Sequence, residues 1–255
     1  MRLATWNVNS LAARLPRVTA WLAERRPDVL CLQETKLADE KFPESELADL
    51  GYEAAHHGDG RWNGVAILSR LGLSDVSRGF DAAEDEHGCR IVAATCGGVR
   101  VHSVYVPNGR SLDSEHYRFK LDWLARLRVM LDERCAADQS VVITGDFNVA
   151  PDDGDVWDPA QFVGSTHVSE AEREALRHIE EWGLTDIFRR FNDPGVFTWW
   201  DYRAGDFHNG RGLRIDLMLV SRDLEQRAAG AFMDRDARKG QKPSDHAPVV
   251  VDFSD

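Results

Sequence analysis

Residues 242–251 read KPSDHAPVVV, so that a polar Ser244-Asp245-His246 stands between two prolines and ahead of a run of three valines. The valines predict a buried strand, and an Asp-His pair at the mouth of a strand is suited to phosphate chemistry. Taken alone, the tripeptide is better explained as a turn, because Asp and Ser are common turn residues. Its interest comes from similar polar clusters at the ends of other predicted strands.

Four more strand ends carry acids and amides in the same way. They are Asn7-Val8-Asn9, Gln33-Glu34-Thr35-Lys36, Tyr105-Val106-Pro107-Asn108 and Gly145-Asp146-Phe147-Asn148. Asn and Asp are depleted in strands, whereas binding and catalytic residues gather on the loops at the ends of a rigid sheet. Each cluster alone has a structural explanation as a turn or a hydrogen bond to a neighbouring strand. Their recurrence is what favours a functional site.

Asp216 is harder to explain structurally, because it interrupts the apolar run IDLMLV at residues 215–220. A carboxylate buried there is costly without a cation or a hydrogen-bond donor. We predict that His246 supplies that donor.

Short apolar runs rich in strand-forming residues alternate with amphipathic segments, without repeats or low-complexity tracts, and this pattern predicts an α/β fold. The expected strands are 2–8, 28–33, 64–69, 90–95, 99–106, 140–144, 214–220 and 248–253. The expected helices are 16–25, with Pro16 in the first turn, 114–135 and 169–182. The apolar stripe of the middle helix indicates core packing only.

Composition describes a globular chain: 43% of the 255 residues are hydrophobic and 29% charged, enough to bury a full core, and we expect a single domain over residues 1–255. No apolar run approaches the roughly 20 residues of a membrane span. The chain begins directly as a strand without a signal-peptide pattern, which favours the cytoplasm. The four cysteines form no C-x-x-C pair and are expected to be reduced and mostly buried. This pattern argues against a zinc site and against a disulfide-stabilised scaffold.

The net charge of −12 argues against nucleic-acid binding, since such proteins tend to be basic. The acid is concentrated at residues 81–86 and 152–158, however, and residues 203–242 hold nine Lys/Arg against six Asp/Glu. An acidic chain can therefore still present one basic face, although a functionally silent asymmetry explains the counts almost as well.

Six motifs together resemble, in order and spacing, those of exonuclease III-type apurinic/apyrimidinic endonucleases, within the endonuclease/exonuclease/phosphatase superfamily. They are Asn7-Val8-Asn9-Ser10, Leu32-Gln33-Glu34-Thr35-Lys36, Tyr105-Val106-Pro107-Asn108, Gly145-Asp146-Phe147-Asn148, Gly212-Leu213-Arg214-Ile215-Asp216 and Pro243-Ser244-Asp245-His246-Ala247-Pro248. The resemblance runs from residue 2 to residue 253. The segment 197–221, with WWDYR at 199–203, resembles the bacterial branch.

The resemblance implies a four-layer α/β sandwich, in which two mixed β-sheets pack face to face with helices on the outside. It also implies a Mg²⁺-dependent enzyme, with Mn²⁺ as a substitute, and the carboxylate and amide ligands support a hard cation independently. The implied activity is cleavage of the DNA backbone 5′ to abasic sites, with 3′→5′ exonuclease and 3′-end-cleaning action. The implied partner is double-stranded DNA with abasic sites or 3′ ends. The protein is expected to act as a monomer, to associate with the nucleoid while it acts on DNA, and to bind no membrane.

Family pattern and charge logic together suggest a role for each site residue. Glu34 is the first metal ligand, with Asn7 beside it either supplying a neutral oxygen or orienting the bound water. Asp146 positions and deprotonates the attacking water. The wider metal set is Asn7, Glu34, Asp146, Asn148, Asp245 and His246, with Asp245 assigned to a second metal or a water. Phosphate contacts come from Asn108, Asn148, Tyr105 and His246, the last oriented by Asp216.

Substrate recognition is assigned to the later loops. Trp199, Leu213 and Ile215 resemble the lining of a pocket for a flipped-out abasic sugar, whereas Trp200 is better explained as a core aromatic. Cations for the DNA backbone are Arg203, Arg211, Arg214, Lys239 and Lys242. Lys36 either touches substrate or caps its loop, with equal support.

Two other functions remain open on the sequence. One is a phosphodiesterase or phosphatase of the same superfold acting on a lipid headgroup or inositol phosphate, which Trp199 and the loop 203–214 disfavour. The other is a non-catalytic relative that binds RNA or protein, which the complete set of polar site residues disfavours. Outside the motifs, His56-His57 is expected on a surface loop at 54–62, and His102 as a satisfied sheet histidine.

Overall fold

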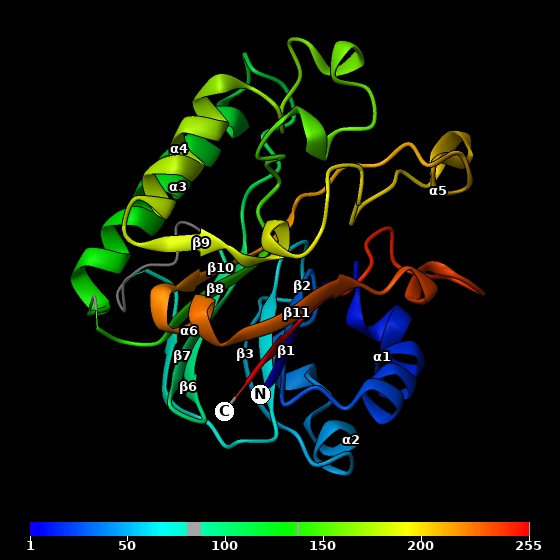
Figure 1. The fold of residues 1–255 in the computed structure, drawn as a ribbon. Helices are drawn as coiled ribbons and strands as arrows, with labels where there is room; N and C mark the ends of the chain where they lie inside the picture. Colours follow the sequence, from blue (N-terminus) through cyan, green and yellow to red (C-terminus); the bar gives the residue numbers. More distant parts are fainter. Residues whose placement is uncertain (81–87, 137, 255) are drawn as a thin grey trace.

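Two six-stranded mixed sheets form the centre of the molecule (Figure 1). The computed structural model describes residues 1–80, 88–136 and 138–254, so the acidic stretch 81–86 lies outside the described residues. The first sheet has the order β11 (Ala228–Met233), β12 (Val249–Phe253), β1 (Arg2–Asn7), β2 (Val29–Gln33), β4 (Val65–Ser69), β3 (Glu53–His57). The second has the order β5 (Ser74–Arg78), β6 (Ile91–Cys96), β7 (Val99–Tyr105), β8 (Val141–Asp146), β10 (Asp216–Ser221), β9 (Leu184–Asp186).

Six α-helices accompany the sheets in the described part of the chain. They are α1 (Leu11–Arg25), α2 (Glu44–Ala48), α3 (Glu115–Arg134), α4 (Glu170–Glu180), α5 (Asp206–Asn209) and α6 (Arg222–Arg227). Among the described residues, no helix is both long and apolar enough to cross a membrane.

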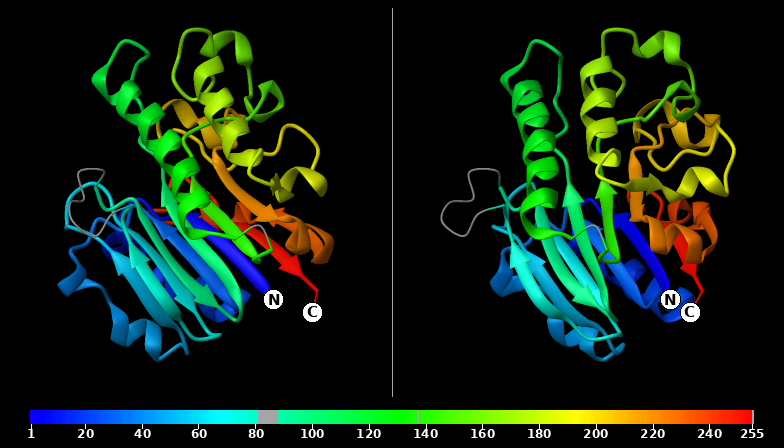
Figure 2. Two further views of the ribbon diagram at one scale, coloured as in Figure 1. Left: turned by 90° about the vertical axis from the view of Figure 1, so that its left-hand side faces the viewer. Right: turned by 60° about the vertical axis from the view of Figure 1, so that its left-hand side comes forward.

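Three apolar clusters separate four layers, as the resemblance implied. The first cluster lies between the sheets and joins Val29 and Ile67 of one to Val101 and Met218 of the other. The second packs α3 and α4 on the outer face of the β7–β8–β10 side, and the third packs α1 and α2 on the outer face of the β1–β2 side. Figure 2 shows the sheets face to face between these helices.

One parallel crossover in each sheet decides where the polar strand ends meet. The connection β1–α1–β2 makes β1 and β2 parallel, and Asn7 pairs with Gln33 at their carboxyl ends. The connection β7–α3–β8 does the same for Tyr105 and Asp146. Parallel neighbours end at the same edge of a sheet, so both crossovers gather their terminal polar residues at one place.

All eight predicted strands are present, with ends within two residues of the prediction. The four strands that the sequence did not predict are β3, β5, β9 and β11, which are the edge strands of the two sheets. Edge strands are covered on fewer sides and carry more polar residues, so the apolar pattern is weak there. Strand β5, for example, is mostly exposed.

Two predictions about local structure were wrong. Helix α1 begins at Leu11, not Pro16, because Ser10 caps it through a bond from the Ala13 amide, and Pro16 lies inside the helix. His56 and His57 belong to β3 rather than to a loop, and His56 is buried with both ring nitrogens 2.7 Å from carboxylate oxygens of Asp39 and Glu44.

His102 is a buried sheet histidine, as predicted. Its Nδ1 lies 3.4 Å from the Val142 carbonyl. Burial, with Arg100 nearby, lowers the pKa of His102 to about 3, so the ring is neutral.

Candidate active site

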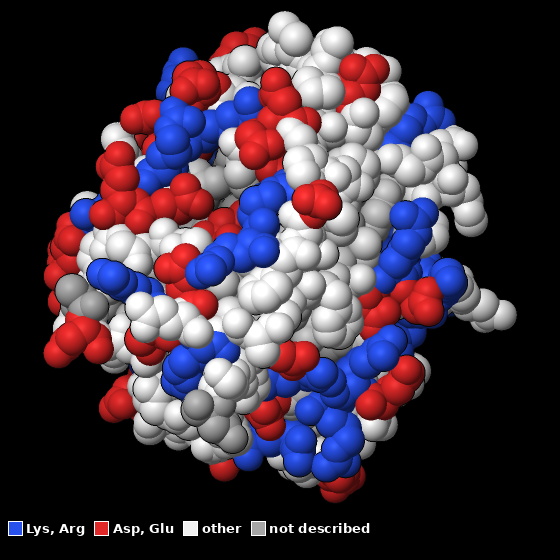
Figure 3. All heavy atoms as spheres, in the orientation of Figure 1, with Lys and Arg blue, Asp and Glu red and all other residues white. Residues whose placement is uncertain are grey.

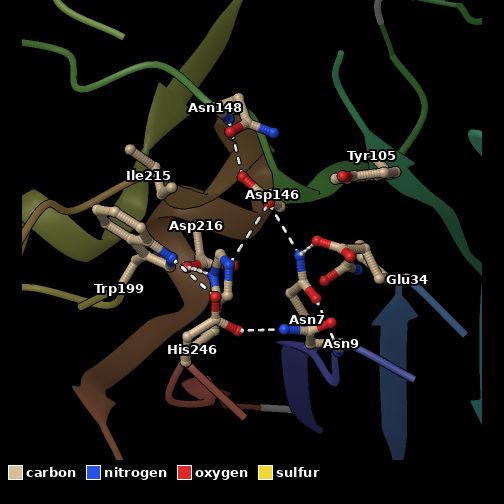
Figure 4. Close-up of polar contacts among 12 residues, drawn as sticks. Asn7, Asn9, Glu34, Tyr105, Asp146, Asn148, Trp199, Ile215, Asp216 and His246 are labelled. Atoms are coloured by element: carbon tan, nitrogen blue, oxygen red, sulfur yellow. Dashed lines mark hydrogen bonds and ion pairs between the residues drawn. The ribbon is translucent and has the colours of Figure 1, made fainter. Parts of the chain in front are cut away.

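The site lies where the carboxyl ends of β1, β2, β7 and β8 meet, with Asp146 at its centre (Figure 4). Gly145 permits this approach, since a Cβ there would come 1.9 Å from the Val104 carbonyl oxygen, and its φ is +149°. Only glycine meets both conditions, which explains the Gly-Asp pair at the end of β8.

Asn7 bridges the acids of the two sheets. Its Nδ2 donates to Glu34 Oε1 at 2.8 Å and to Asp146 Oδ2 at 2.9 Å, while its Oδ1 accepts from the Asn9 amide at 3.0 Å. The amide nitrogen therefore points at the two carboxylates. Of the two predicted roles of Asn7, that of an oxygen ligand does not fit this orientation, because the side-chain nitrogen joins Glu34 and Asp146 and the oxygen accepts from Asn9.

His246 is held between two aspartates, as the apolar surroundings of Asp216 predicted. Its Nδ1 is 2.8 Å from Asp216 Oδ2, and its Nε2 is 3.7 Å from Asp146 Oδ2. Asp216 and Asp146 are cross-strand partners on β10 and β8. Ser244 fixes the approach, since its hydroxyl donates to the Asn7 carbonyl at 2.7 Å and accepts from the His246 amide at 3.2 Å.

Burial and mutual charge shift the protonation of this pair. Burial raises the pKa of Asp146 to about 7, helped by Asp216 and Glu34 and opposed by protonated His246. Burial by itself lowers the pKa of His246, but the carboxylates of Asp216 and Asp146 outweigh it and raise that pKa to about 10. The imidazole is therefore a cation at neutral pH, and Asp146 is poised to exchange a proton near neutrality.

Among the described residues, Glu34, Asp146 and His246 are the acidic and histidine side chains close enough together to hold a metal ion, with one candidate ligand atom from each within 4.8 Å of the others. Two carboxylates suit a hard divalent cation such as Mg²⁺ or Mn²⁺. The Lys36 ammonium lies 2.9 Å from Glu34 Oε2 and balances its charge. Glu34 also has a left-handed backbone, φ +51°, a strain that persists mainly at functional positions.

Two other predicted ligands are turned toward protein partners. Asn148 Nδ2 donates to the Val106 carbonyl at 2.9 Å, and its backbone amide donates to Asp146 Oδ1 at 2.9 Å. Asp245 accepts from Asn9 Nδ2 at 3.0 Å and from Trp199 Nε1 at 3.1 Å. Both side chains are therefore held by hydrogen bonds within the protein, and Asp245 lies outside the group of acids and histidine that could hold a metal ion.

Tyr105 stands beside the acids as a hydroxyl donor. Burial, with Glu34 and Asp146, raises its pKa well above the ordinary range, so the phenol keeps its proton. Arg90 covers the ring at 4.8 Å from its centre. Asn108 is joined to the site by a hydrogen bond, since its Nδ2 donates to Asn148 Oδ1 at 3.2 Å.

Trp199, predicted as a pocket residue, borders His246, and the backbones of these two residues form a β-bridge. Leu213 and Ile215 are buried in a small cluster with Val156, against which Trp199 packs. Leu213 and Ile215 therefore lie behind Trp199, and the partly exposed Trp199 is the member of the predicted pocket that borders the site. Trp200 is fully buried, as predicted for a core aromatic.

The predicted DNA-binding cations differ in their exposure to solvent. Arg214 is 1% exposed, and its guanidinium is held by Asp155 at 2.5 Å and Asp186 at 2.7 Å. The prediction that it binds phosphate was wrong, because a buried arginine paired with two carboxylates cannot reach DNA. Arg203 is exposed but paired with Asp201 at 2.6 Å, and Lys242 is exposed.

Arg211 and Lys239 also have acidic partners, Asp206 at 3.2 Å and Asp236 at 2.6 Å. In Figure 3, Lys and Arg gather down the right-hand side, where α1 and the segment around residues 235–242 lie, while acids line the left edge over α3 and α4. Although the chain is acidic overall, one side of the molecule is therefore more basic than the rest.

Two neighbours of the site, Lys36 and Trp62, were left undecided or assigned no role from the sequence. Lys36 touches both Glu34 and Asn9 Oδ1, the latter at 2.7 Å, so it belongs to the site. Trp62 is 77% exposed and lines a hollow of about 580 Å³ with Arg90, Tyr105 and Asn108. The sequence feature that could have identified Trp62 is the presence of a single aromatic residue in the polar segment 58–64.

Comparison with known proteins agrees with this geometry. A family model described as Endonuclease/Exonuclease/phosphatase family matches residues 4–246. Exodeoxyribonuclease III of Haemophilus influenzae is 34% identical over 99% of this chain and 100% of its own length. An AP endonuclease structure from Archaeoglobus fulgidus superposes with a TM-score of 0.95 at 38% identity, covering 99% of both chains. The 3′-5′ exonuclease NExo from Neisseria meningitidis does so with a TM-score of 0.96 at 41% identity, covering 100% of both.

The chain belongs to the Endonuclease/Exonuclease/phosphatase family. Within it, the chain is a hydrolase of the exonuclease III and AP endonuclease group, as the full-length identity of 34–41% to such proteins shows. The resemblance drawn from the six sequence motifs is thereby confirmed.

Proposed function

We propose that this chain is a metal-dependent DNA-repair nuclease that hydrolyses phosphoester bonds at abasic sites and at 3′ ends of duplex DNA. The observation that carries the proposal is the Asp216–His246–Asp146 arrangement beside Glu34, in a chain of the exonuclease III and AP endonuclease group. A related NExo structure, a 3′ phosphatase bound to product DNA hairpin, superposes with a TM-score of 0.96 at 40% identity.

The proposed chemistry begins with Asp146. Its pKa of about 7 suits a base that takes a proton from the attacking water near neutral pH. The backbone amide of Asn148 and the side chain of Asn7 hold its two oxygens, so the base is fixed in position. A bound Mg²⁺ or Mn²⁺, held by Glu34 and Asp146, would neutralise charge on the phosphate.

The remaining residues handle the negative charge of the phosphate and the leaving oxygen. His246 is a cation whose Nδ1 is occupied by Asp216, which leaves its Nε2 proton for a phosphate oxygen. Tyr105 keeps its proton and donates to the phosphate or to the leaving 3′-oxygen. Asn148, which is joined to Asn108, lies next to Asp146 (Figure 4), and both amides would donate to phosphate oxygens, while Trp199 would face the sugar.

The test uses three substrates, each with and without Mg²⁺: an abasic duplex, a duplex with a recessed end bearing a 3′-phosphate, and a headgroup phosphodiester. Mg²⁺-dependent hydrolysis of either DNA substrate supports the proposal. Hydrolysis of the headgroup substrate alone would replace it with the lipid or inositol alternative. The ratio of abasic-site incision to 3′-end hydrolysis on labelled duplexes then defines the balance of activities.

Loss of Glu34 should weaken the metal site. We expect Glu34→Gln to bind Mn²⁺ about 10–100-fold more weakly than the parent protein, because one of two carboxylate ligands becomes neutral. Mn²⁺ titration of the metal-free proteins, followed by electron paramagnetic resonance, measures this. Glu53→Gln, on the exposed edge strand β3, is the matched control and should bind Mn²⁺ normally. Equal affinity in Glu34→Gln would remove Glu34 from the metal site.

Trp62 should contribute to DNA binding. The loop that carries it is tied to the site, since the Lys36 amide donates to the Asn63 carbonyl at 2.9 Å. Stacking of an aromatic on a nucleotide contributes about 1–3 kcal/mol, so we expect Trp62→Ala to raise the Kd for DNA by roughly 5–100-fold. Leu71→Ala, an exposed apolar residue beyond the opposite end of β4, is the control. An unchanged Kd in fluorescence anisotropy would exclude Trp62 from the interface.

A further inference from the structure

A buried ion pair lies directly against the backbone of Asn148, outside the metal and phosphate residues. Lys120 of α3 and Glu172 of α4 are both completely buried, and the ammonium contacts the carboxylate directly. Lys120 Nζ also donates to the Asn148 carbonyl at 2.6 Å and lies 3.4 Å from the Asn108 carbonyl. One ammonium thus reaches the backbones of both amide residues proposed to face the phosphate.

The carboxylate of Glu172 is saturated by the loop that precedes α4. Its Oε1 accepts from Thr166 Oγ1 at 2.7 Å and from the His167 amide at 2.9 Å. Its Oε2 accepts from the Ser169 amide at 3.0 Å and from the Ser169 hydroxyl at 2.6 Å, completing a capping box. Thr166 Oγ1 in turn lies 3.0 Å from the Asn108 carbonyl.

The backbone that this pair holds is strained. Asn148 has φ +51° and His167 has φ +78°, both in the left-handed region. His167 Nδ1 is 2.5 Å from the same Asn148 carbonyl that accepts from Lys120. Such conformations persist only where surrounding contacts determine them, and here the contacts converge on one carbonyl oxygen.

The cost of burying two charges makes a purely structural explanation weak. A buried ion pair often contributes no more stability than well-packed apolar side chains of the same volume. Lys120 and Glu172 lie beside the site, and every hydrogen-bond partner named here belongs to residues 108, 148 or 166–169. The arrangement therefore indicates that the buried pair fixes the backbone positions of Asn108 and Asn148.

We propose that Lys120 and Glu172 are a positioning pair that holds the side-chain amides of Asn108 and Asn148 in place for the substrate phosphate. The proposal rests on the proposed phosphoester hydrolysis. Neither residue touches the substrate. Asn108 and Asn148 are joined to each other through Asn108 Nδ2 and Asn148 Oδ1, so moving one backbone carbonyl displaces both amides.

The test is a double-mutant cycle on an abasic duplex that the parent protein cleaves. We expect Lys120→Met to lower kcat by roughly 10–100-fold, since small displacements of a catalytic group have effects of this size. The Mn²⁺ affinity should stay within twofold, because the carboxylates of Glu34 and Asp146 are untouched. In an Asn108→Ala/Asn148→Ala background, Lys120→Met should lower kcat by less than threefold more, because both side-chain amides that it positions are already gone.

Two controls make the result decisive. Arg128→Met, which removes a half-buried cation paired with Asp132 from the same helix, should leave kcat unchanged. If Lys120→Met does not fold by circular dichroism, Thr166→Val takes its place in the cycle, since it removes the hydroxyl that lies between Glu172 and the Asn108 carbonyl and keeps the ion pair. Fully additive losses, or an unchanged kcat in a folded variant, would overturn the positioning role. If the parent protein cleaves no DNA, the proposed function itself fails.

Discussion

Asp146→Asn is expected to lower kcat by about 10³-fold or more while the protein still binds DNA. The substitution removes a general base, whose contribution is typically 10²–10⁴-fold, and one carboxylate of the metal group. Asparagine is nearly isosteric and keeps one side-chain oxygen, which can accept from either Asn7 Nδ2 or the Asn148 amide, so the substitution removes one of the two hydrogen bonds. Single-turnover cleavage of an abasic duplex at saturating Mg²⁺ measures the loss, and anisotropy without Mg²⁺ measures the binding.

The same variant should gain stability at high pH. The folded pKa of Asp146 is about 7, above its unfolded value, so its ionisation opposes folding as the pH rises past the unfolded pKa. The melting temperature of metal-free Asp146→Asn should therefore exceed that of the parent protein by more at pH 8 than at pH 5. Asp252→Asn, at the far end of β12, is the matched control and should keep full activity. Near-normal turnover in Asp146→Asn would contradict its role as base.

The inner strands and the central site residues were predictable because both leave local signals. Eight strands carried continuous apolar runs, and the polar residues at their ends broke those runs visibly. Asp216 gave the sharpest signal, since a carboxylate between isoleucine and leucine demanded a partner, and His246 is that partner at 2.8 Å. The family motifs added the order in which the strand ends meet.

Arg214 could not be assigned correctly from its motif. Its partners, Asp155 and Asp186, lie 59 and 28 residues away in the chain, and nothing local distinguishes a buried arginine from an exposed one. The four edge strands were missed for a related reason, because their hydrogen bonds come from one neighbour and their side chains are less covered. Both failures concern burial, which depends on tertiary contacts.

The direction of a polar side chain is also a tertiary property. Asn7 and Asp245 occupy the predicted place, yet the first turns its nitrogen to the acids and the second is occupied by Asn9 and Trp199. Residue type predicts which atoms are available for a metal. Hydrogen-bond geometry decides which of them face it.

Asp216→Asn should lower kcat by roughly 10²–10⁴-fold without touching the metal carboxylates. Asp216 is a positioning residue, since it binds His246 Nδ1 and leaves Nε2 for the phosphate. Asparagine keeps an oxygen acceptor at that place but removes the charge that keeps the imidazole protonated in a buried position. The Mn²⁺ affinity should change little, which separates this variant from Glu34→Gln.

The protonation of His246 distinguishes this role from simple packing. In the metal-free parent protein, burial lowers the pKa of His246, and Asp216 and Asp146 raise it to about 10, so its ring should titrate only in alkaline solution. Removing the Asp216 charge leaves the burial effect less opposed, and the pKa should fall toward neutrality. NMR titration of the imidazole resonances measures this directly. A normal kcat together with an unchanged His246 pKa in Asp216→Asn would reduce Asp216 to a core residue, whereas a lowered pKa with a lowered kcat assigns the protonated imidazole to phosphate binding.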